Sequence, residues 1–241
     1  MPWPCSVTSA PRSLAGQLLD VVGRRVPACR PWLGAIADAG DVVVLEPVFA
    51  EASRRVGAAP LALTDTEQTA LARAGVDWSL AAWCVDDVVR VATLLLTAQR
   101  APAEVEGFML RRRRYGDVRQ RAALMRALPL LPDARQWLAI ALEARRADVR
   151  AVLEALACDN PYPAAHFHAL HFDDLVMAAL EADLPLARIV GLGARVTDQL
   201  ASAAARVAET RRAAGRRGRR RSCGGCRGAQ REPRAGDGLG R

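Results

Sequence analysis

The sequence predicts an all-α protein arranged as a HEAT-like stack of antiparallel amphipathic helices. Aromatic residues make up only 5% of the 241 residues, whereas alanine and leucine are abundant, and small or unbranched side chains lose little entropy in a helix. Apolar residues also recur at three- and four-residue spacing in segments that proline, glycine and aspartate separate. Three such segments between residues 118 and 156 follow one another closely, which is typical of a helical stack.

In the N-terminal half, this spacing predicts a series of helices after a disordered stretch at residues 1–12. They are expected over 13–26, 32–39, 41–55 and 65–73, over about 20 residues ending near Arg100, and over 102–115. The β-branched run at 42–45 also suits a strand, but Val44, Val48 and Ala52 continue at four-residue spacing and favour a helix. Either Thr64 or Asp65 is placed to cap the helix that follows it. The helix ending near Arg100 has the apolar pattern of a buried central element.

In the C-terminal half, apolar stripes predict helices over 118–128, 137–142, 149–156 and 172–180. A turn is expected at 184–189, and Thr197 with Asp198 caps a last helix that ends near Ala214. From Gly215 onward, glycine and arginine dominate, and such a segment cannot bury enough apolar surface to fold alone. The sequence therefore predicts one helical domain over 13–214 and a disordered basic tail over 215–241.

The formal net charge of +8 belongs to the tail. Residues 211–241 contain 11 arginines against Glu232 and Asp237, and subtracting their +9 from +8 leaves −1 for residues 1–210. A basic protein commonly binds nucleic acid, but here that inference applies to the tail only. The arginines at 211–221 suit phosphate neutralisation, yet no aromatic residue lies between them to stack on bases. Weak, nonspecific polyanion binding is expected.

The six cysteines, at positions 5, 29, 84, 158, 223 and 226, are scattered and do not form a disulfide framework, which predicts a reducing compartment. Cys223 and Cys226 have zinc-knuckle spacing, but a zinc site needs four ligands and no second pair follows. The N-terminal residues lack the apolar segment of a signal peptide. The most apolar run, 91–96, is far shorter than the roughly 20 residues of a membrane span. A soluble, cytoplasmic protein is expected.

The stretch 158–167 is the most distinctive part of the chain. Two prolines flank Tyr162, which predicts a rigid extended or turning loop. Such a loop can bind a ligand, because scaffolds often carry binding residues on loops, or it can simply connect two packed helices. The candidate ligand- or partner-binding residues are Asn160, Pro161, Tyr162, Pro163, His166, Asp173 and Asp174. No catalytic residue is predicted, since the sequence contains neither a nucleophile elbow nor a P-loop.

The three histidines of the chain lie close together at 166, 168 and 171. If residues 168–174 are helical, His168, His171 and Asp174 share one face at three-residue spacing, and His166 does not. Imidazole and carboxylate ligands of this kind suit zinc or iron. A His-Glu-x-x-His signature is missing, and the neighbouring phenylalanines suggest packing instead. A metal-dependent enzyme using these three residues is therefore the alternative, and no cofactor is predicted.

Six short motifs carry a resemblance to a known family. They are Ala59-Pro60-Leu61-Ala62-Leu63, Trp83-Cys84-Val85-Asp86, Ala127-Leu128-Pro129-Leu130-Leu131-Pro132, Asn160-Pro161-Tyr162-Pro163-Ala164, Pro185-Leu186-Ala187-Arg188-Ile189-Val190-Gly191-Leu192 and Arg211-Arg212-Ala213-Ala214-Gly215. In order and spacing, residues 60–215 resemble the EboA family of metabolite-traffic proteins. The chain departs from that family at Phe172-Asp173-Asp174, where the family typically has Phe-Asn-Gln, and after Gly215 nothing matches.

The resemblance implies a non-enzymatic helical scaffold or carrier that assists the traffic of a secondary-metabolite precursor toward the periplasm. The partners that it implies are a hydrophobic small metabolite, a prenyltransferase-like membrane protein and soluble pathway enzymes. It also implies a place in the cytoplasm, including the inner face of the membrane. The two alternatives are the metal-dependent enzyme and binding of nucleic acid or an anionic membrane by residues 211–241.

Overall fold

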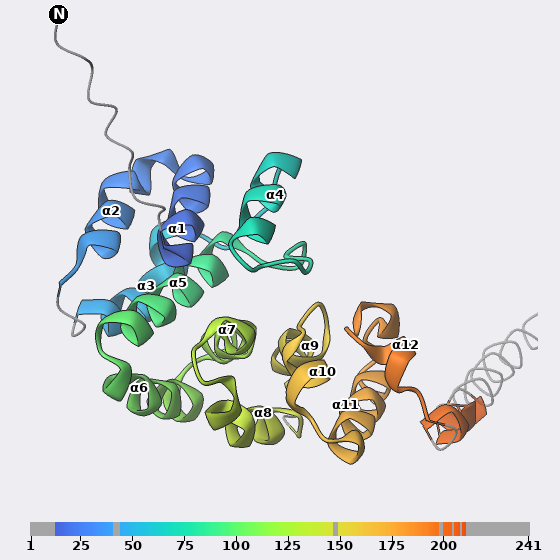
Figure 1. Cartoon of the computed structure of the whole chain (residues 1–241). Coiled ribbons are helices and arrows are strands. Elements are labelled where there is room, and N and C mark those ends of the chain that lie inside the picture. Colours follow the sequence, from blue (N-terminus) through green and yellow to red (C-terminus); the bar gives the residue numbers. More distant parts are fainter. Residues whose placement is uncertain are drawn as a thin grey trace, which may run out of the picture. The chain divides into compact units, whose positions relative to one another are not determined.

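The computed structural model describes residues 13–40, 44–146, 149–197, 200–203, 205–207 and 209–210. Contacts within the chain divide it into two compact units, Met1–Val196 and Thr197–Arg241, and each is described by itself. The described residues form helices, turns and two isolated β-bridges, and no strand is found among them (Figure 1). The all-α prediction is therefore confirmed. The predicted disorder of 1–12 and 215–241 falls outside the described residues, and the predicted domain limits stay predictions.

The first unit is built from twelve described α-helices joined by short connections. They are α1 (Leu14–Arg25), α2 (Arg30–Asp38), α3 (Leu45–Val56), α4 (Asp65–Arg73), α5 (Val85–Arg100), α6 (Pro102–Tyr115), α7 (Val118–Ala127), α8 (Leu138–Ala144), α9 (Arg150–Ala157), α10 (Tyr162–His166), α11 (Ala169–Glu181) and α12 (Leu192–Arg195). Short 3-10 turns lie at Pro27–Cys29, Leu128–Leu130, Ala134–Trp137 and Leu186–Arg188.

Helix starts follow the capping signals in the sequence. The Ser13 hydroxyl accepts a hydrogen bond from the Gly16 N–H at 3.3 Å and begins α1. Of the two candidate caps before α4, Thr64 is the one used: its hydroxyl accepts from the Glu67 N–H, and the Glu67 carboxylate accepts from the Thr64 N–H. This capping box satisfies backbone groups that the first turn leaves without a helical partner.

The central helix begins later than its apolar pattern suggests. Helix α5 has 16 residues and starts at Val85. The segment before it runs beside residues 59–61, where the Leu61 N–H donates to the Trp83 carbonyl at 2.9 Å and the Val85 N–H to the Ala59 carbonyl at 3.0 Å. These backbone groups are paired with another segment, so the helical ladder does not extend back toward residue 77.

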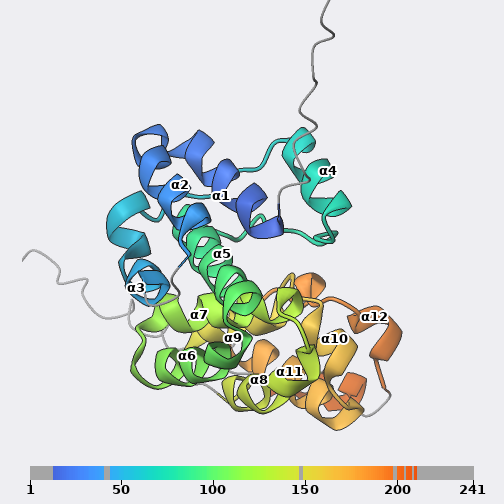
Figure 2. The same cartoon turned by 60° about the vertical axis from the view of Figure 1, so that its left-hand side comes forward.

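Helix α5 forms the centre of the first unit. It packs against α1, α3, α6 and α7, and it lies among these helices in both views (Figures 1 and 2). Residues 85–98 are all buried, which is typical of a helix that neighbours cover on every side. The hydroxyls of Thr93 and Thr97 donate to the carbonyls of Val89 and Thr93, so these buried polar groups are satisfied within the helix.

Helix α9 is the common neighbour of the C-terminal helices of the first unit. Helix α7 packs on α9, α9 packs on α11, and α8 contacts α9 (Figure 1). The contacts do not establish successive two-helix repeats, so the HEAT-like arrangement stays a prediction.

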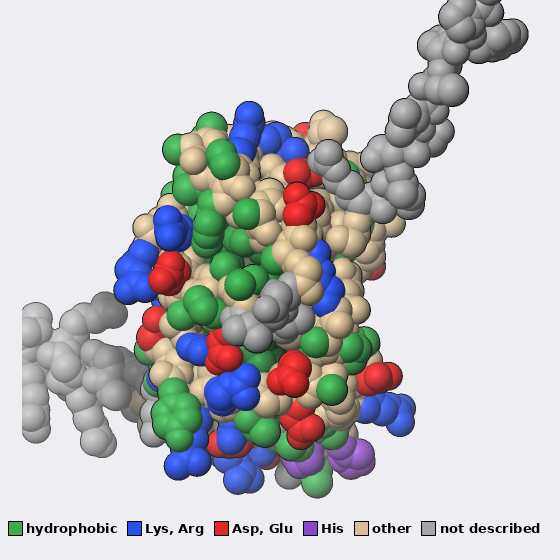
Figure 3. Space-filling view, turned by 90° about the vertical axis from the view of Figure 1, so that its left-hand side faces the viewer, with side chains coloured by type: hydrophobic (Ala, Val, Ile, Leu, Met, Phe, Trp, Pro, Cys, Tyr) green, Lys and Arg blue, Asp and Glu red, His purple; other side chains and the backbone are tan. Residues whose placement is uncertain are grey.

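In the second unit, residues 200–203, 205–207 and 209–210 are helical, and the Thr197 hydroxyl accepts from the Leu200 N–H at 3.0 Å. The predicted cap at Thr197 is thus confirmed, whereas 211–214 lie outside the described residues. None of the helices in the described ranges has the length and apolar character to cross a bilayer. Basic and acidic side chains lie next to one another over the face in Figure 3, in keeping with the near-neutral charge of residues 1–210.

Candidate functional site

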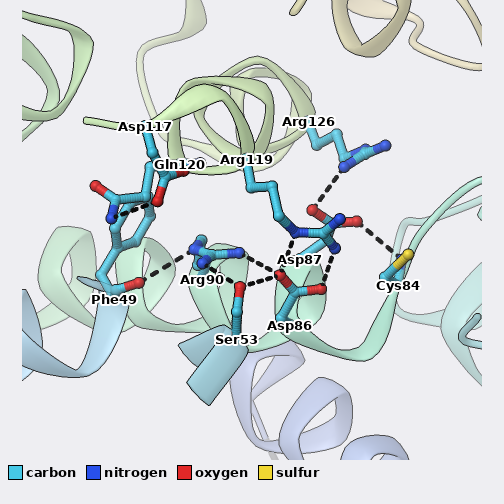
Figure 4. Close-up of polar contacts among 10 residues, drawn as sticks. All are labelled: Phe49, Ser53, Cys84, Asp86, Asp87, Arg90, Asp117, Arg119, Gln120 and Arg126. Carbon is cyan, nitrogen blue, oxygen red and sulfur yellow. Dashed lines mark hydrogen bonds and ion pairs between the residues drawn. The ribbon is translucent and has the colours of Figure 1, made fainter. Parts of the chain in front are cut away.

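Three charged residues lie buried in the first two turns of α5. Asp86, Asp87 and Arg90 expose 0%, 2% and 1% of their surface. Buried charges are rare in proteins unless they are paired, because removing a charge from water costs several kcal/mol. Two carboxylates at a helix N-terminus are favoured by the helix dipole, but this effect alone does not compensate for their burial. Neighbouring helices provide the partners (Figure 4).

Asp86 is bound from three helices. From α7, Arg119 donates Nε to Oδ2 at 2.8 Å and Nη2 to Oδ1 at 2.5 Å, a two-pronged pair that suits a planar guanidinium. Arg90 of α5 donates Nη1 to Oδ2 at 2.6 Å, and the Ser53 hydroxyl of α3 donates to the same oxygen at 2.7 Å. Burial alone would raise the pKa of Asp86, but the hydrogen bonds from Arg119, Ser53 and Arg90 outweigh it and lower the pKa to about 2.

Arg90 is held by contacts along its whole guanidinium. Its Nε donates to the Phe49 carbonyl at 3.1 Å, and its Nη2 donates to the Ser53 hydroxyl oxygen at 2.8 Å. The guanidinium carbon also lies 5.9 Å from the centre of the Phe49 ring. Arg90 and Asp86 therefore join α5 to the last two turns of α3, as Figure 4 shows.

Asp87 caps its own helix and pairs with α7. Its Oδ2 accepts from the Cys84 N–H at 2.8 Å, and its Oδ1 lies 2.6 Å from Nη1 of Arg126. Burial raises the pKa of Asp87, and the charge of Arg126 and the Cys84 N–H only partly oppose this. Arg126 also donates to the Ala82 carbonyl at 3.3 Å, so it fixes the loop before α5 against α7.

The cluster, defined as Ser53, Asp86, Asp87, Arg90, Arg119 and Arg126, is built to position helices. A carboxylate with a pKa of about 2 is a poor proton acceptor at neutral pH, so Asp86 does not suit general base catalysis. Cys84, Asp86 and Asp87 do offer ligand atoms within 4.8 Å of one another. A metal there would have to displace the guanidinium groups of Arg119 and Arg126, which occupy the same oxygens.

Sequence reasoning found only one member of this cluster. Asp86 lies in the Trp83-Cys84-Val85-Asp86 motif, whereas Ser53, Arg90, Arg119 and Arg126 were not predicted. A signal was present: charges at 86, 87 and 90 interrupt a helix whose apolar pattern predicts complete burial. Two of the partners come from α7, more than 25 residues away, and no local pattern identifies them.

The predicted binding loop turns its polar groups into the protein. The Asn160 amide donates to the carbonyls of Met125 and Ala155, both at 2.9 Å, and its oxygen accepts from the Tyr162 N–H at 3.0 Å. The Tyr162 hydroxyl donates to the Ala134 carbonyl at 2.6 Å, and burial raises its pKa to about 12. Pro161 and Pro163 start a five-residue helix, α10, where a loop was expected. This geometry favours the connector interpretation, and ligand binding by these residues stays a prediction.

The structure separates the residues of the predicted metal site. His168 precedes α11 as its N-cap, so it is not part of the helical face that His171 and Asp174 were expected to share with it. The Asp174 carboxylate pairs with Nη1 of Arg145. His166 lies with its ring centre 4.6 Å from that of Tyr162, and Asp173 has a partner of its own. Among the described residues, His168, His171 and Asp174 do not form a group of ligand atoms within 4.8 Å.

Comparison with known proteins identifies the family. A family model described as "Metabolite traffic protein EboA" matches residues 32–220, which is 189 of the 241 residues. The match begins nearly 30 residues before the resemblance noted in the sequence. Neither a curated protein nor a solved structure matches the chain significantly. Since the matched region covers more than three quarters of the sequence, this chain belongs to the EboA family of metabolite-traffic proteins.

Proposed function

We propose that this chain is a non-enzymatic helical scaffold or carrier. Its family places it in metabolite traffic, and the finer role is our proposal. The observation that carries the proposal is the extent of the family match, which runs from within α2 past α12. The feature common to the family is thus a whole helical body, and a body of this kind offers surfaces on which ligands and partner proteins can bind.

The use of the motif residues supports this proposal. Asp86 and Asn160 each belong to a motif of the family resemblance. The polar side-chain atoms of both residues form hydrogen bonds to neighbouring helices. Such hydrogen bonds fix the arrangement of the helices, and a scaffold needs a fixed arrangement to present its binding surfaces.

The proposed cargo is a hydrophobic precursor of a secondary metabolite, moved toward the periplasm. The proposed partners are a prenyltransferase-like membrane protein and the soluble enzymes of the same pathway, and the proposed location is the cytoplasm at the inner face of the membrane. These details come from the family resemblance in the motifs of residues 59–215.

The test is mild isolation of the full-length chain from its native host, followed by native mass spectrometry and cross-linking. We expect a bound small organic molecule, a membrane protein, or both. The control is a full-length variant with glutamine at the arginines of 216–221, because capture through this basic block would disappear in it and specific capture would not.

Three results would contradict the proposal. Conversion of a pathway metabolite by the purified chain alone would make it an enzyme. Stoichiometric bound metal that is lost in His168→Ala would support the metal-dependent alternative instead. Recovery of the chain without any molecule or partner, in repeated isolations, would argue against the carrier role.

A further inference from the structure

Residues from the end of α8, the start of α9 and α11 line a cleft of about 600 Å³. Its volume is in the range of small-molecule sites. Arg145, Arg146 and Arg150 line it, together with the apolar side chains of Leu153 and Ala178. Ala147 and Asp148, between the arginines in sequence, lie outside the described residues. The cleft is separate from the charged cluster of α5.

Arg145 is the unusual residue of this cleft. It exposes only 5% of its surface, and its Nη1 pairs with Asp174 and donates to the His171 carbonyl at 3.5 Å. Its Nε is buried without a hydrogen-bond partner. A guanidinium carries five donors, and leaving a buried donor without an acceptor is unfavourable. The arginine therefore has donor capacity that the protein does not use.

The other two arginines place more positive charge at the same cleft. Arg150 donates Nη1 to the carbonyls of Ala182 and Asp183, at the C-terminal end of α11, which holds its side chain against the cleft wall. Arg146 is exposed beside it. Three guanidiniums face two acidic residues of the lining, Asp174 and Glu181, so the described lining keeps a net positive charge.

Asp174 holds the position that an incoming anion would take. Its side chain is 65% exposed, whereas the Arg145 side chain that it pairs with is 5% exposed. The exposed carboxylate can return to water, but Arg145 is buried and therefore needs another anionic partner in its place. A ligand anion could thus replace Asp174 at Arg145, while its apolar part contacts Leu153 and Ala178.

We propose that this cleft binds a small organic anion, with a carboxylate or phosphate at Arg145, Arg146 and Arg150 and an apolar body along α9 and α11. This deepens the proposed function, on which it rests, by naming the chemical class of the cargo. Arginine suits such groups because its planar fork bonds two oxygens at once.

The test is isothermal titration calorimetry of the full-length chain with octyl phosphate. Octanol and inorganic phosphate serve as probes that carry only the apolar part or only the anion, and both should bind more weakly. Replacement of the two exposed arginines, Arg146→Gln with Arg150→Gln, should lower the affinity for octyl phosphate about tenfold, as expected for losing charge-assisted hydrogen bonds. Asp174→Asn should raise the affinity severalfold, because it removes the competing carboxylate.

The control is the charge-matched pair Arg54→Gln with Arg73→Gln, two exposed arginines outside the cleft, which should leave the affinity unchanged. Equal affinity in the cleft variant and the wild type would overturn the proposal, as would an equal loss in the control variant or binding of octanol as tight as that of octyl phosphate. If octyl phosphate does not bind but partners are still captured in the isolation experiment, the anion site in the cleft is wrong and the scaffold role stands. If the purified chain converts a metabolite, the non-enzymatic scaffold role is wrong, but anion binding in the cleft is not contradicted.

Discussion

Removing the charge of Asp86 should destabilise the protein strongly. The substitution Asp86→Asn keeps the volume of the side chain, so its effect measures charge and hydrogen bonding rather than a cavity. Arg90 exposes only 1% of its surface, and without the carboxylate its charge stays buried next to an amide. Breaking a buried ion pair by removing one partner costs about 3–5 kcal/mol. We expect a loss of this size in the free energy of unfolding.

Two further variants separate charge burial from other causes. Arg119→Gln removes a side chain that is 42% exposed, and Asp86 keeps its bonds from Arg90 and Ser53, so the loss should be nearer about 2 kcal/mol. The double change Asp86→Leu with Arg90→Met replaces both buried charges by apolar groups. It should recover most of the stability lost in Asp86→Asn, because apolar replacement of a buried pair is often neutral.

The assay is urea unfolding followed by circular dichroism at 222 nm, with free energies compared at a common slope. If Asp86→Asn costs less than Arg119→Gln, the buried pair with Arg90 does not dominate the cluster, and the reasoning from burial is wrong. If the double variant is as unstable as Asp86→Asn, the loss comes from packing and not from an uncompensated charge.

Three other predictions follow from the same contacts. The pKa of Asp86 is about 2 against an ordinary 3.8, so its contribution to stability is complete above about pH 4 and is lost as the pH falls toward 2. In Asp86→Asn, the free energy of unfolding should therefore depend less on pH in this window. Asp87→Asn should not show this change, because burial raises the pKa of Asp87. Asn160→Ala should lower the free energy of unfolding by about 2–4 kcal/mol, because the Ala155 carbonyl loses the Asn160 amide, the Met125 carbonyl keeps only the Leu128 N–H, and the Tyr162 N–H loses its acceptor. Tyr162→Phe should lower it by only about 1 kcal/mol. An unchanged melting temperature in Asn160→Ala would refute the connector interpretation. Arg195 donates to three carbonyls in and just after α10, and its guanidinium carbon lies 4.2 Å from the centre of the Phe172 ring. Arg195→Lys should therefore lower the free energy of unfolding by about 1–2 kcal/mol, measured by thermal unfolding, and equal stability would show that the positive charge alone suffices.

The helices could be predicted from the sequence because local signals mark them. Apolar spacing and caps gave α1, α4 and α6 nearly residue by residue, since Ser13, Thr64 and Pro102 each act on the turn that follows them. The start of α5 was placed too early because backbone groups of residues 83 and 85 pair with residues 61 and 59, a contact between segments more than 20 residues apart. Periodicity reports which face of a helix is apolar and contains no information on such pairing.

The charged cluster could not be predicted for a related reason. The charges at 86, 87 and 90 stand out in a helix whose apolar pattern predicts burial, but pairs at this spacing are also common on exposed helix faces, so the sequence alone does not decide between the two. Their burial depends on α3 and α7 covering that face, and the sequence does not say which helices meet. At the histidine site, the spacing at 168, 171 and 174 assumes a helix that starts before residue 169, whereas α11 starts there and His168 is its N-cap. Metal binding by these residues stays a prediction.

Two of the six motifs of the family resemblance, around Asp86 and Asn160, direct their polar groups inward. A buried polar network does little for net stability, but it excludes arrangements in which its members are unpaired, and so it selects one packing of the helices. If these motifs set the packing, the residues that contact cargo have to be sought elsewhere, among side chains whose donors are not used within the fold. Arg145, with a buried Nε that has no partner and a carboxylate neighbour open to displacement, meets this condition. Arg113 and Arg121 also have a buried Nε without a hydrogen-bond partner, so it is the cleft and the exposed Asp174 beside it that single out Arg145 as a place for a ligand.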